Sequence, residues 1–401
     1  MKTVLPLFVF VDACGWEIIK DDPFARAFAP YRRKLKSVFG FSSACIPSIL
    51  SGRMPVEHRN WCYFVYDPSN SPFKSLRKLR WLPEALTSRR RFRRWLSLFV
   101  KSRLKFRGYF DLYNIPFRHI SLFNFTEKKN PLQSGGLNQG PNIFDLLETH
   151  NIPYHVSDPA KGEKANLEAL KQDIAAERID FAFLYWPDLD GLLHRVGNDV
   201  PAIPKKLRAY EPMLDDLLAS TNGHYDEIKL YIFSDHGMAN CDELVDLQGK
   251  VDRLGLEIGV DYAVVYDSTM ARFWFLSTQA RHAITACLAL IPQGHIMPDQ
   301  ELHRLGALFP DRYFGEMIFL MKEGVLIVPS HMGERPIRAM HGYHPEAPHS
   351  YAALLSNQPD IPDEITGIPD IYKLMVRSAK EASARNERAS APGNSPELSL
   401  H

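Results

Sequence analysis

Carboxylates and histidines follow several short apolar runs of this sequence, and such side chains can bind a divalent metal. The clearest run is residues 230–238, LYIFSDHGM, in which four apolar residues precede Asp235 and His236. An apolar run that ends in turn residues is typical of a parallel strand feeding a loop, and ligands bind at that end of open α/β sheets. A carboxylate oxygen and an imidazole nitrogen are suitable metal ligands. The alternative is that the segment only caps a helix and forms a turn.

A second pair of this kind follows the apolar run at 179–186. Asp190 and His194 are four residues apart, so on a helix they share one face at about 5–6 Å and could bind one metal. Asp188 competes for the same role at a poorer spacing.

Three further positions could complete the site. Asp12 ends the apolar run at 4–11, although it could instead cap the following helix. Ser42 follows a glycine turn ahead of a helix that we expect to open at Pro47. A hydroxyl at a helix N-terminus suits phosphate, and an N-cap serine is the alternative. His341 lies near the end of the chain, ahead of a closing apolar run.

The elements that must position these residues alternate along the chain. Apolar runs that suit buried strands lie at 4–11, 179–186 and 230–233, with helical patterns at 162–177 and 204–220. This alternation predicts an α/β fold, a three-layer sandwich whose mostly parallel central sheet is flanked by helices. Residues 261–275 resemble paired strands and indicate a smaller cap subdomain.

Composition is that of an ordinary globular protein. The chain has 401 residues, of which 45% are hydrophobic and 24% charged, and its net charge is +1. Its cysteines, at positions 14, 45, 62, 241 and 287, are odd in number and widely spaced, which favours reduced thiols and a cytoplasmic location. Asp12 interrupts the N-terminal apolar run without a cleavage site, so a first strand fits better than a signal peptide. No run approaches the length of a transmembrane helix.

Positive charge is concentrated in residues 74–107, which contain 13 Lys and Arg against one acid, Glu84. Phe92, Trp95, Leu96, Phe99 and Leu104 fall at helical spacing within it. An amphipathic cationic helix could touch an anionic membrane, at the inner membrane surface for a cytoplasmic protein, or a polyanionic substrate. The alternative is an insertion that packs its aromatic residues on the core. No nucleic-acid partner is expected, since no recognition module surrounds the segment.

We expect one catalytic domain over residues 1–375. Two insertions interrupt it, the basic one at 69–135 and the cap at 260–335. Residues 376–401 lose their aromatic residues and are expected to form a disordered tail.

Taken in chain order, the candidate residues closely resemble the alkaline phosphatase superfamily, and within it the type I phosphodiesterase/nucleotide pyrophosphatase branch. The resemblance covers most of residues 4–68, 140–240 and 335–356. In that family the nucleophile lies ten residues before the glycine of a TGxxPxxH-like motif, and SGRMPVEH at 51–58 puts this position at Ser42. The family's metal ligands match Asp12, Asp190, His194, Asp235, His236 and His341.

The resemblance implies a two-metal phosphoester hydrolase, a phosphodiesterase that works through a phosphoseryl intermediate on Ser42. One metal is held by Asp190, His194 and His341. The other is held by Asp12, Asp235, His236 and the Ser42 oxygen. Zinc suits these ligands best, with manganese as the alternative. The substrate would be a small-molecule or a lipid- or glycan-linked phosphoester.

Some positions depart from the family. The asparagine that binds phosphate in nucleotide pyrophosphatases falls at Tyr63, where Asn60 or Trp61 could substitute. A sulfatase would need a cysteine in place of Ser42, whereas Cys45 lies three residues later. Ser43 is a rival nucleophile. A phosphomonoesterase, a phospho-transferase acting on a glycan or lipid head group, and a non-catalytic binding protein on the same fold are the alternatives.

Overall fold

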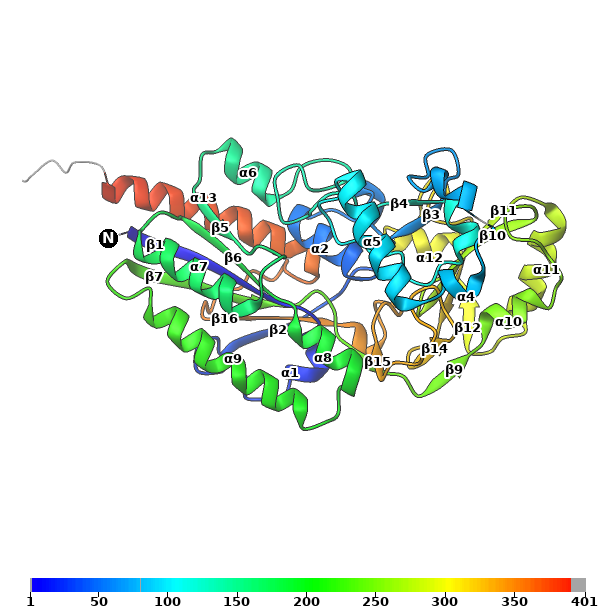
Figure 1. The fold of residues 1–401 in the computed structure, drawn as a ribbon. Coiled ribbons are helices and arrows are strands. Elements are labelled where there is room, and N and C mark those ends of the chain that lie inside the picture. Colours follow the sequence, from blue (N-terminus) through cyan, green and yellow to red (C-terminus); the bar gives the residue numbers. More distant parts are fainter. Residues whose placement is uncertain (1, 80, 391–401) are drawn as a thin grey trace, which may run out of the picture.

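A six-stranded sheet forms the centre of the computed structural model, which describes residues 2–79 and 81–390. Its strand order is β2-β16-β7-β1-β6-β5 (Figure 1). The bounds are Lys2–Val11 (β1), Tyr31–Leu35 (β2), Tyr154–Val156 (β5), Phe181–Trp186 (β6), Tyr225–Phe233 (β7) and Ala352–Ser356 (β16). Strands β5, β6, β1 and β7 are parallel, whereas β16 is antiparallel to both neighbours. The mostly parallel sheet predicted from the sequence is confirmed.

Helices cover both faces of this sheet, because successive side chains of a strand point to opposite faces. Phe8 and Phe10 of β1 belong to one buried cluster, shared with α2 (Ser42–Ser51), α6 (Ile143–Thr149) and α13 (Ile371–Ser390). Leu7 and Val9 belong to the opposite cluster, shared with α7 (Glu163–Ala175), α8 (Asp188–Val196) and α9 (Ala202–Ala219). The three layers expected from the sequence are therefore present (Figure 1).

The carboxyl ends of three central strands lie side by side. Phe10 pairs with Tyr185 of β6 and with Phe233 of β7. Asp12, the loop after Trp186 and the loop after Phe233 consequently start at one edge of the sheet. This register positions the candidate metal ligands.

The cap region is built on a second sheet, whose order is β10-β11-β13-β12. Its elements are β10 (Tyr262–Tyr266), β11 (Met270–Phe275), α11 (Thr278–Ala289), β12 (Gly294–Ile296), α12 (Asp299–Arg304) and β13 (Met317–Met321). Two small pairings lie beside it, β9 (Glu243–Val245) with β14 (Val325–Ile327), and β8 (Ala239–Asn240) with β15 (Ala339–Met340). The second of these positions His341, which directly follows β15.

The basic segment contains the amphipathic helix expected there. It folds as η1 (Lys74–Leu79), α4 (Glu84–Thr87) and α5 (Arg90–Leu104), between β3 (Phe64–Tyr66) and its partner β4 (Phe123–Phe125). The aromatic residues of α5 divide between two environments: Phe92 packs against the core, whereas Trp95 and Phe99 are exposed. A helix on the surface and an insertion packed on the core are the two alternatives for the basic segment, and α5 has features of both.

The expected disordered tail begins too early. Helix α13 continues to Ser390 and buries Met375, Ala379 and Ala382 against the sheet. Asn386 donates from Nδ2 to the Val4 carbonyl and accepts from the Thr3 and Val4 amides. The prediction of disorder was wrong for 376–390, because small residues pack closely against β1 without any aromatic signal. The rest of the predicted tail, residues 391–401, lies outside the described range. No helix of the described chain, α13 included, is long and apolar enough to cross a membrane.

Candidate metal centre

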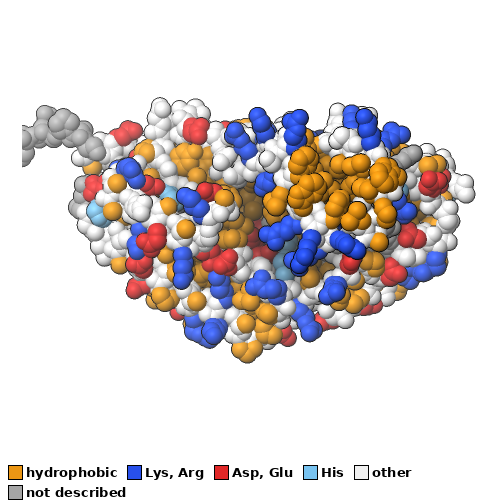
Figure 2. All heavy atoms as spheres, viewed as in Figure 1, with side chains coloured by type: hydrophobic (Ala, Val, Ile, Leu, Met, Phe, Trp, Pro, Cys, Tyr) orange, Lys and Arg blue, Asp and Glu red, His pale blue; other side chains and the backbone are white. Residues whose placement is uncertain are grey.

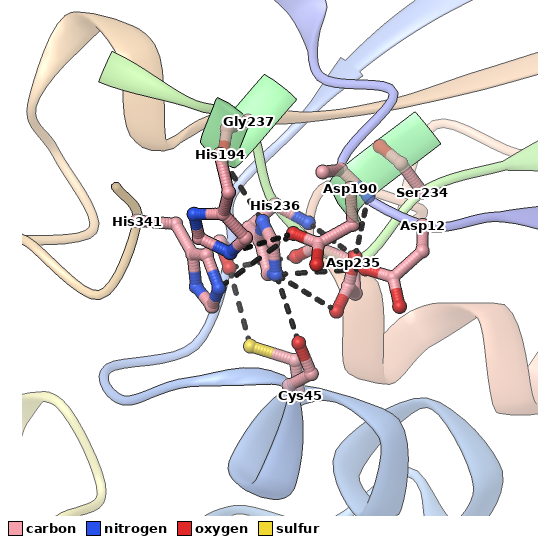
Figure 3. Close-up of polar contacts among 12 residues, drawn as sticks. Asp12, Cys45, Asp190, His194, Ser234, Asp235, His236, Gly237 and His341 are labelled. Carbon is pink, nitrogen blue, oxygen red and sulfur yellow. Dashed lines mark hydrogen bonds and ion pairs between the residues drawn. The ribbon is translucent and has the colours of Figure 1, made fainter. Parts of the chain in front are cut away.

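Six side chains that could bind metal converge at the carboxyl edge of the sheet (Figure 3). They form two groups of three, within each of which the candidate ligand atoms lie within 4.8 Å of one another. The groups are Asp12, Asp235 and His236, and Asp190, His194 and His341. The His236 and His341 rings stack with centroids 3.7 Å apart, so the two groups adjoin. The structure brings together the carboxylates and histidines of each ligand set that the family resemblance implied, and their binding of metal stays a prediction.

The first group contacts the Ser42 hydroxyl through His236. The His236 Nε2 atom lies 3.0 Å from Ser42 Oγ, 3.2 Å from Asp235 Oδ2 and 3.7 Å from Asp12 Oδ1. Nδ1 of His236 donates to the Gly237 carbonyl, which leaves the Nε2 lone pair facing the Ser42 oxygen. Ser42 begins α2, which therefore starts five residues before Pro47, where the sequence suggested that it would open.

The second group depends on the first turns of α8. Asp190 and His194 lie four apart on this helix, with His194 Nε2 3.3 Å from Asp190 Oδ1. His341 Nε2 lies 3.8 Å from the same oxygen. His194 Nδ1 donates to the Ala339 carbonyl of β15, which orients the ring and frees Nε2.

Three carboxylate oxygens in these groups are buried and have no hydrogen-bond partner in the described chain. They are Asp12 Oδ1, Asp190 Oδ1 and Asp235 Oδ2. The other oxygens of two of these carboxylates are used: Asp12 Oδ2 accepts from the Tyr185 hydroxyl at 2.6 Å, and Asp235 Oδ1 accepts from the Ala13 and His236 amides. Buried acceptors are normally paired, so oxygens aimed at free imidazole nitrogens fit divalent cations. The residues present suit the metals that the family uses.

The charges of the site are unfavourable without a cation. Burial, together with the charges of Asp235 and Asp190, raises the pKa of Asp12 well above its usual range. Burial also raises the pKa of Asp235 to about 7. For Asp190, burial acts in the same direction, but the adjacent His194 outweighs it and lowers the pKa. The clustered buried carboxylates therefore repel one another, and a bound divalent cation would reduce this repulsion.

The structure separates the ligands from their sequence-level rivals. Ser43 is buried and donates to the Trp61 carbonyl, so Ser42 is the serine that faces the site. Asp188 points outward and pairs with Lys206. The Cys45 thiol contacts Ser37 and the Val38 carbonyl, and burial raises its pKa.

Three histidines near His341 in the sequence also have other partners. His331 receives a hydrogen bond from the Tyr266 amide, His344 pairs with Glu301, and His349 pairs with Glu323.

The two expected substrate-binding residues differ in what they contact. Asn60 is buried and its Oδ1 accepts from the Asn138 amide, a contact that holds two loops together. Tyr63 packs against Tyr109 and Tyr113, with ring centroids 5.7 and 5.8 Å away. Burial raises the pKa of Tyr63, and the charge of Glu127 adds to this.

Sequence reasoning missed Tyr185, which orients Asp12. Tyr185 lies in the apolar run of β6, where it reads as a core residue. The available signal was its position: a tyrosine one residue before the end of a strand that pairs with β1 presents its hydroxyl at the edge where Asp12 lies.

The three-layer fold, with candidate metal ligands gathered at the carboxyl ends of β1, β6 and β7, and the family match that follows make this chain a member of the alkaline phosphatase superfamily. Within that superfamily, residues 8–344 match the type I phosphodiesterase/nucleotide pyrophosphatase family. The chain belongs to this family, whose members hydrolyse phosphoric ester bonds.

Individual relatives align over short stretches. Human ectonucleotide pyrophosphatase/phosphodiesterase family member 5 is 28% identical over 115 residues, which are 28% of this chain and 24% of that protein. Mouse bis(5'-adenosyl)-triphosphatase enpp4 is 32% identical over 80 residues, 19% of this chain and 18% of the relative. The chain therefore matches about a quarter or less of these relatives' lengths.

Solved structures of the family show the same fold. Murine ectonucleotide pyrophosphatase/phosphodiesterase 5 superposes with a TM-score of 0.65 over 95% of both chains at 14% identity, and an inactive form of it in complex with AMP gives the same values. The human protein gives a TM-score of 0.63 at 13% identity over 95% of both chains.

Proposed function

We propose that this protein is a two-metal phosphodiesterase in which Ser42 is the nucleophile. The observation that carries the proposal is the position of Ser42 Oγ, 3.0 Å from His236 Nε2, which itself lies 3.7 Å and 3.2 Å from the unpaired oxygens of Asp12 and Asp235. A cation held by these atoms would also meet the Ser42 oxygen. Family membership supports the reaction class, hydrolysis of phosphoric esters.

The chain's own residues account for the positioning of the reacting groups. Ser42 begins α2, so the positive end of the helix dipole faces the site where a phosphate would bind. Tyr185 and the Ala13 amide hold Asp12 and Asp235 in one orientation each. Two bound divalent ions supply a clamp that neutralises charge on the attacking and leaving oxygens of an in-line displacement.

The displacement proceeds in two halves at Ser42. Its Oγ gives up its proton to solvent and forms a bond to phosphorus while the bond to the leaving oxygen breaks, which gives a phosphorylated Ser42 and an alcohol once the leaving oxygen takes up a proton. Water then attacks the same phosphorus, and the bond to Oγ breaks to return the free hydroxyl. Covalent catalysis of this kind divides one difficult hydrolysis into two easier steps.

Zinc is the metal we propose for both positions, because three imidazoles and three carboxylates match its usual ligands, and manganese is the alternative. Tyr63 stands where nucleotide pyrophosphatases have a phosphate-binding asparagine. We therefore do not assign a nucleotide as the substrate and propose only a phosphodiester. The five cysteines form no disulfide, and the cytoplasmic location expected from their pattern stays a prediction.

The test is hydrolysis of bis-p-nitrophenyl phosphate and of p-nitrophenyl phosphate by protein loaded with zinc or manganese. The proposal expects metal-dependent hydrolysis that a chelator abolishes, with the diester cleaved faster. Faster cleavage of the monoester would instead indicate a phosphomonoesterase. If neither ester is cleaved by protein that holds two equivalents of metal, the protein is a binding protein on this fold.

A further inference from the structure

The basic insertion exposes a concentration of large apolar side chains. Of the 14 such side chains that are exposed in the described chain, eight lie between residues 79 and 109. Trp81 is 72% exposed, and Trp95, Leu98 and Phe99 of α5 are 60, 61 and 53% exposed. Figure 2 shows a connected hydrophobic area over the α4–α5 region. We call Trp81, Trp95, Leu98, Phe99 and Tyr109 the apolar patch, and contiguous patches of this kind mark interaction sites.

The inner face of α5 fixes the helix, so its outer face is available. Leu96, Ser97 and Val100 are buried. Ser97 Oγ donates to Asp111 Oδ1 and accepts from the Leu112 amide. Arg93 donates to two backbone carbonyls of residues 113 and 115, which makes this arginine structural. The exposed aromatic residues are therefore presented on an anchored helix.

Positive charge surrounds the apolar patch. Arg90, Arg91 and Arg94 are exposed on the solvent side of α5, and none of them forms an ion pair with another described residue. The segment 74–107 carries 13 basic residues against one acid. Arginines that flank exposed tryptophan, phenylalanine and leucine are typical of helices that lie in the headgroup region of an anionic bilayer.

The apolar patch lies beside a hollow in the same face of the molecule (Figure 2). Tyr109, which is 54% exposed, packs on Tyr63 with the two ring centroids 5.7 Å apart. Figure 2 shows the hydrophobic area next to a hollow in the same face, with Lys and Arg side chains along the rim and acidic and histidine side chains within. A surface that covered the patch would also face this opening.

We propose that the apolar patch and the arginines of α5 dock the protein on an anionic lipid bilayer. Docking brings the metal centre to phosphodiesters carried by lipids in that bilayer, a consequence that rests on the proposed hydrolase function. Charge complementarity argues for the anionic surface. The aliphatic Leu98, which is 61% exposed, argues against a nucleic acid, since bases stack on aromatic or guanidinium planes, whereas acyl chains accept leucine.

The test is flotation of the full chain with vesicles of phosphatidylcholine alone or with added phosphatidylserine. The wild type is expected to float only with the anionic vesicles, and less so at high salt. Substituting R90Q, R91Q and R94Q together should weaken partition on the order of a hundredfold, about fivefold for each arginine. Substituting W95S and F99S together should weaken it at least about tenfold.

Matched controls keep this result specific. Leu290→Ser removes an 83% exposed apolar side chain elsewhere, and Arg208→Gln removes an exposed charge from α9; both should float like the wild type. Circular dichroism checks folding. The proposal is wrong if the wild type does not float with anionic vesicles, or if the patch variants float equally well. It is also wrong if the patch binds an RNA oligonucleotide or a second copy of the chain in place of vesicles.

Hydrolysis of soluble bis-p-nitrophenyl phosphate separates docking from catalysis. Both patch variants should keep wild-type activity on this substrate, because none of the substituted residues belongs to the metal centre. A protein that floats but hydrolyses no phosphoester contradicts the proposed function and leaves docking supported. A protein that hydrolyses the phosphoester but does not float contradicts the docking proposal and leaves the proposed function supported.

Discussion

The hydroxyl oxygen of Ser42 lies 3.0 Å from Nε2 of His236, although 194 positions separate the two residues in the chain. The contact joins the N-terminus of α2 to the loop after β7. It places the proposed nucleophile beside one of the proposed metal ligands. The consequences for metal binding and for catalysis can be measured separately.

Removing one buried carboxylate should weaken metal binding and raise the stability of the metal-free protein. Asp235→Asn removes a ligand, and it also removes a charge that repels Asp12 and Asp190. We expect loss of about one equivalent of metal per chain and a higher melting temperature without metal, since unpaired buried charges destabilise. Elemental analysis and thermal unfolding measure both effects. Asp188→Asn, an exposed change nearby, should alter neither, and full metal content in Asp235→Asn would rule out this ligand assignment.

Tyr185 should control metal affinity without binding metal. Its hydroxyl donates to Asp12 Oδ2 at 2.6 Å and thereby turns Oδ1 toward the site. Tyr185→Phe should weaken metal binding roughly 10- to 100-fold, the usual effect of losing such a partner. Competition with a chromophoric chelator measures this. Tyr154→Phe, which loses a surface hydrogen bond to Glu148, is the matched control, and equal affinities in the two variants would contradict the positioning role.

The buried His58 should make the protein sensitive to acid. Its Nδ1 accepts from the Asn60 amide and its Nε2 contacts Ser48 Oγ, an arrangement that requires the neutral ring. Burial lowers the pKa of His58 to about 3. Protons therefore bind the unfolded chain more readily, so this stabilisation is present above pH 6.5 and declines as the pH falls toward 3.

The comparison that isolates this effect is His58→Gln. Between pH 6.5 and 5, the wild type should lose about 2 kcal/mol of unfolding free energy more than the variant does. Denaturant unfolding at the two pH values measures the difference. Identical pH dependence in both proteins would show that His58 does not titrate in this way.

The last turns of α13 should contribute to global stability. Asn386 satisfies the amides of Thr3 and Val4 and the Val4 carbonyl. Asn386→Ala leaves these buried groups unpaired and should cost roughly 2–3 kcal/mol of unfolding free energy. Arg388→Ala, an exposed change two residues later, should cost less than about 0.5 kcal/mol. Equal unfolding free energies for the two variants would mean that the end of α13 does not hold β1.

Local sequence patterns were sufficient for the sheet edge. The apolar runs before Asp12 and Asp235 specify buried parallel strands, and register alone then brings their carboxyl ends together. The spacing of Asp190 and His194 specifies one face of a helix. These features are local, so one sequence suffices to predict them.

Other features depend on tertiary contacts that have no local signal. The sequence does not distinguish Ser42 from Ser43. Their difference is a tertiary contact, in which the buried Ser43 hydroxyl donates to the Trp61 carbonyl, whereas the Ser42 hydroxyl faces the site. Tyr185 resembles a core residue until its hydroxyl meets Asp12. Helix α13 has no aromatic residue after Tyr372, yet Met375 and Ala379 pack in the same cluster as Phe8 of β1, and Asn386 bonds to the β1 backbone.

Comparison of Ser42→Ala with Ser43→Ala tests the central claim most directly. Both variants keep all six carboxylate and imidazole ligands and should be assayed with bis-p-nitrophenyl phosphate at equal, measured metal content. We predict that Ser42→Ala binds metal yet loses activity by at least about a thousandfold, whereas Ser43→Ala retains activity in its folded fraction. Retention of wild-type turnover by Ser42→Ala would contradict the assignment of Ser42 as the nucleophile.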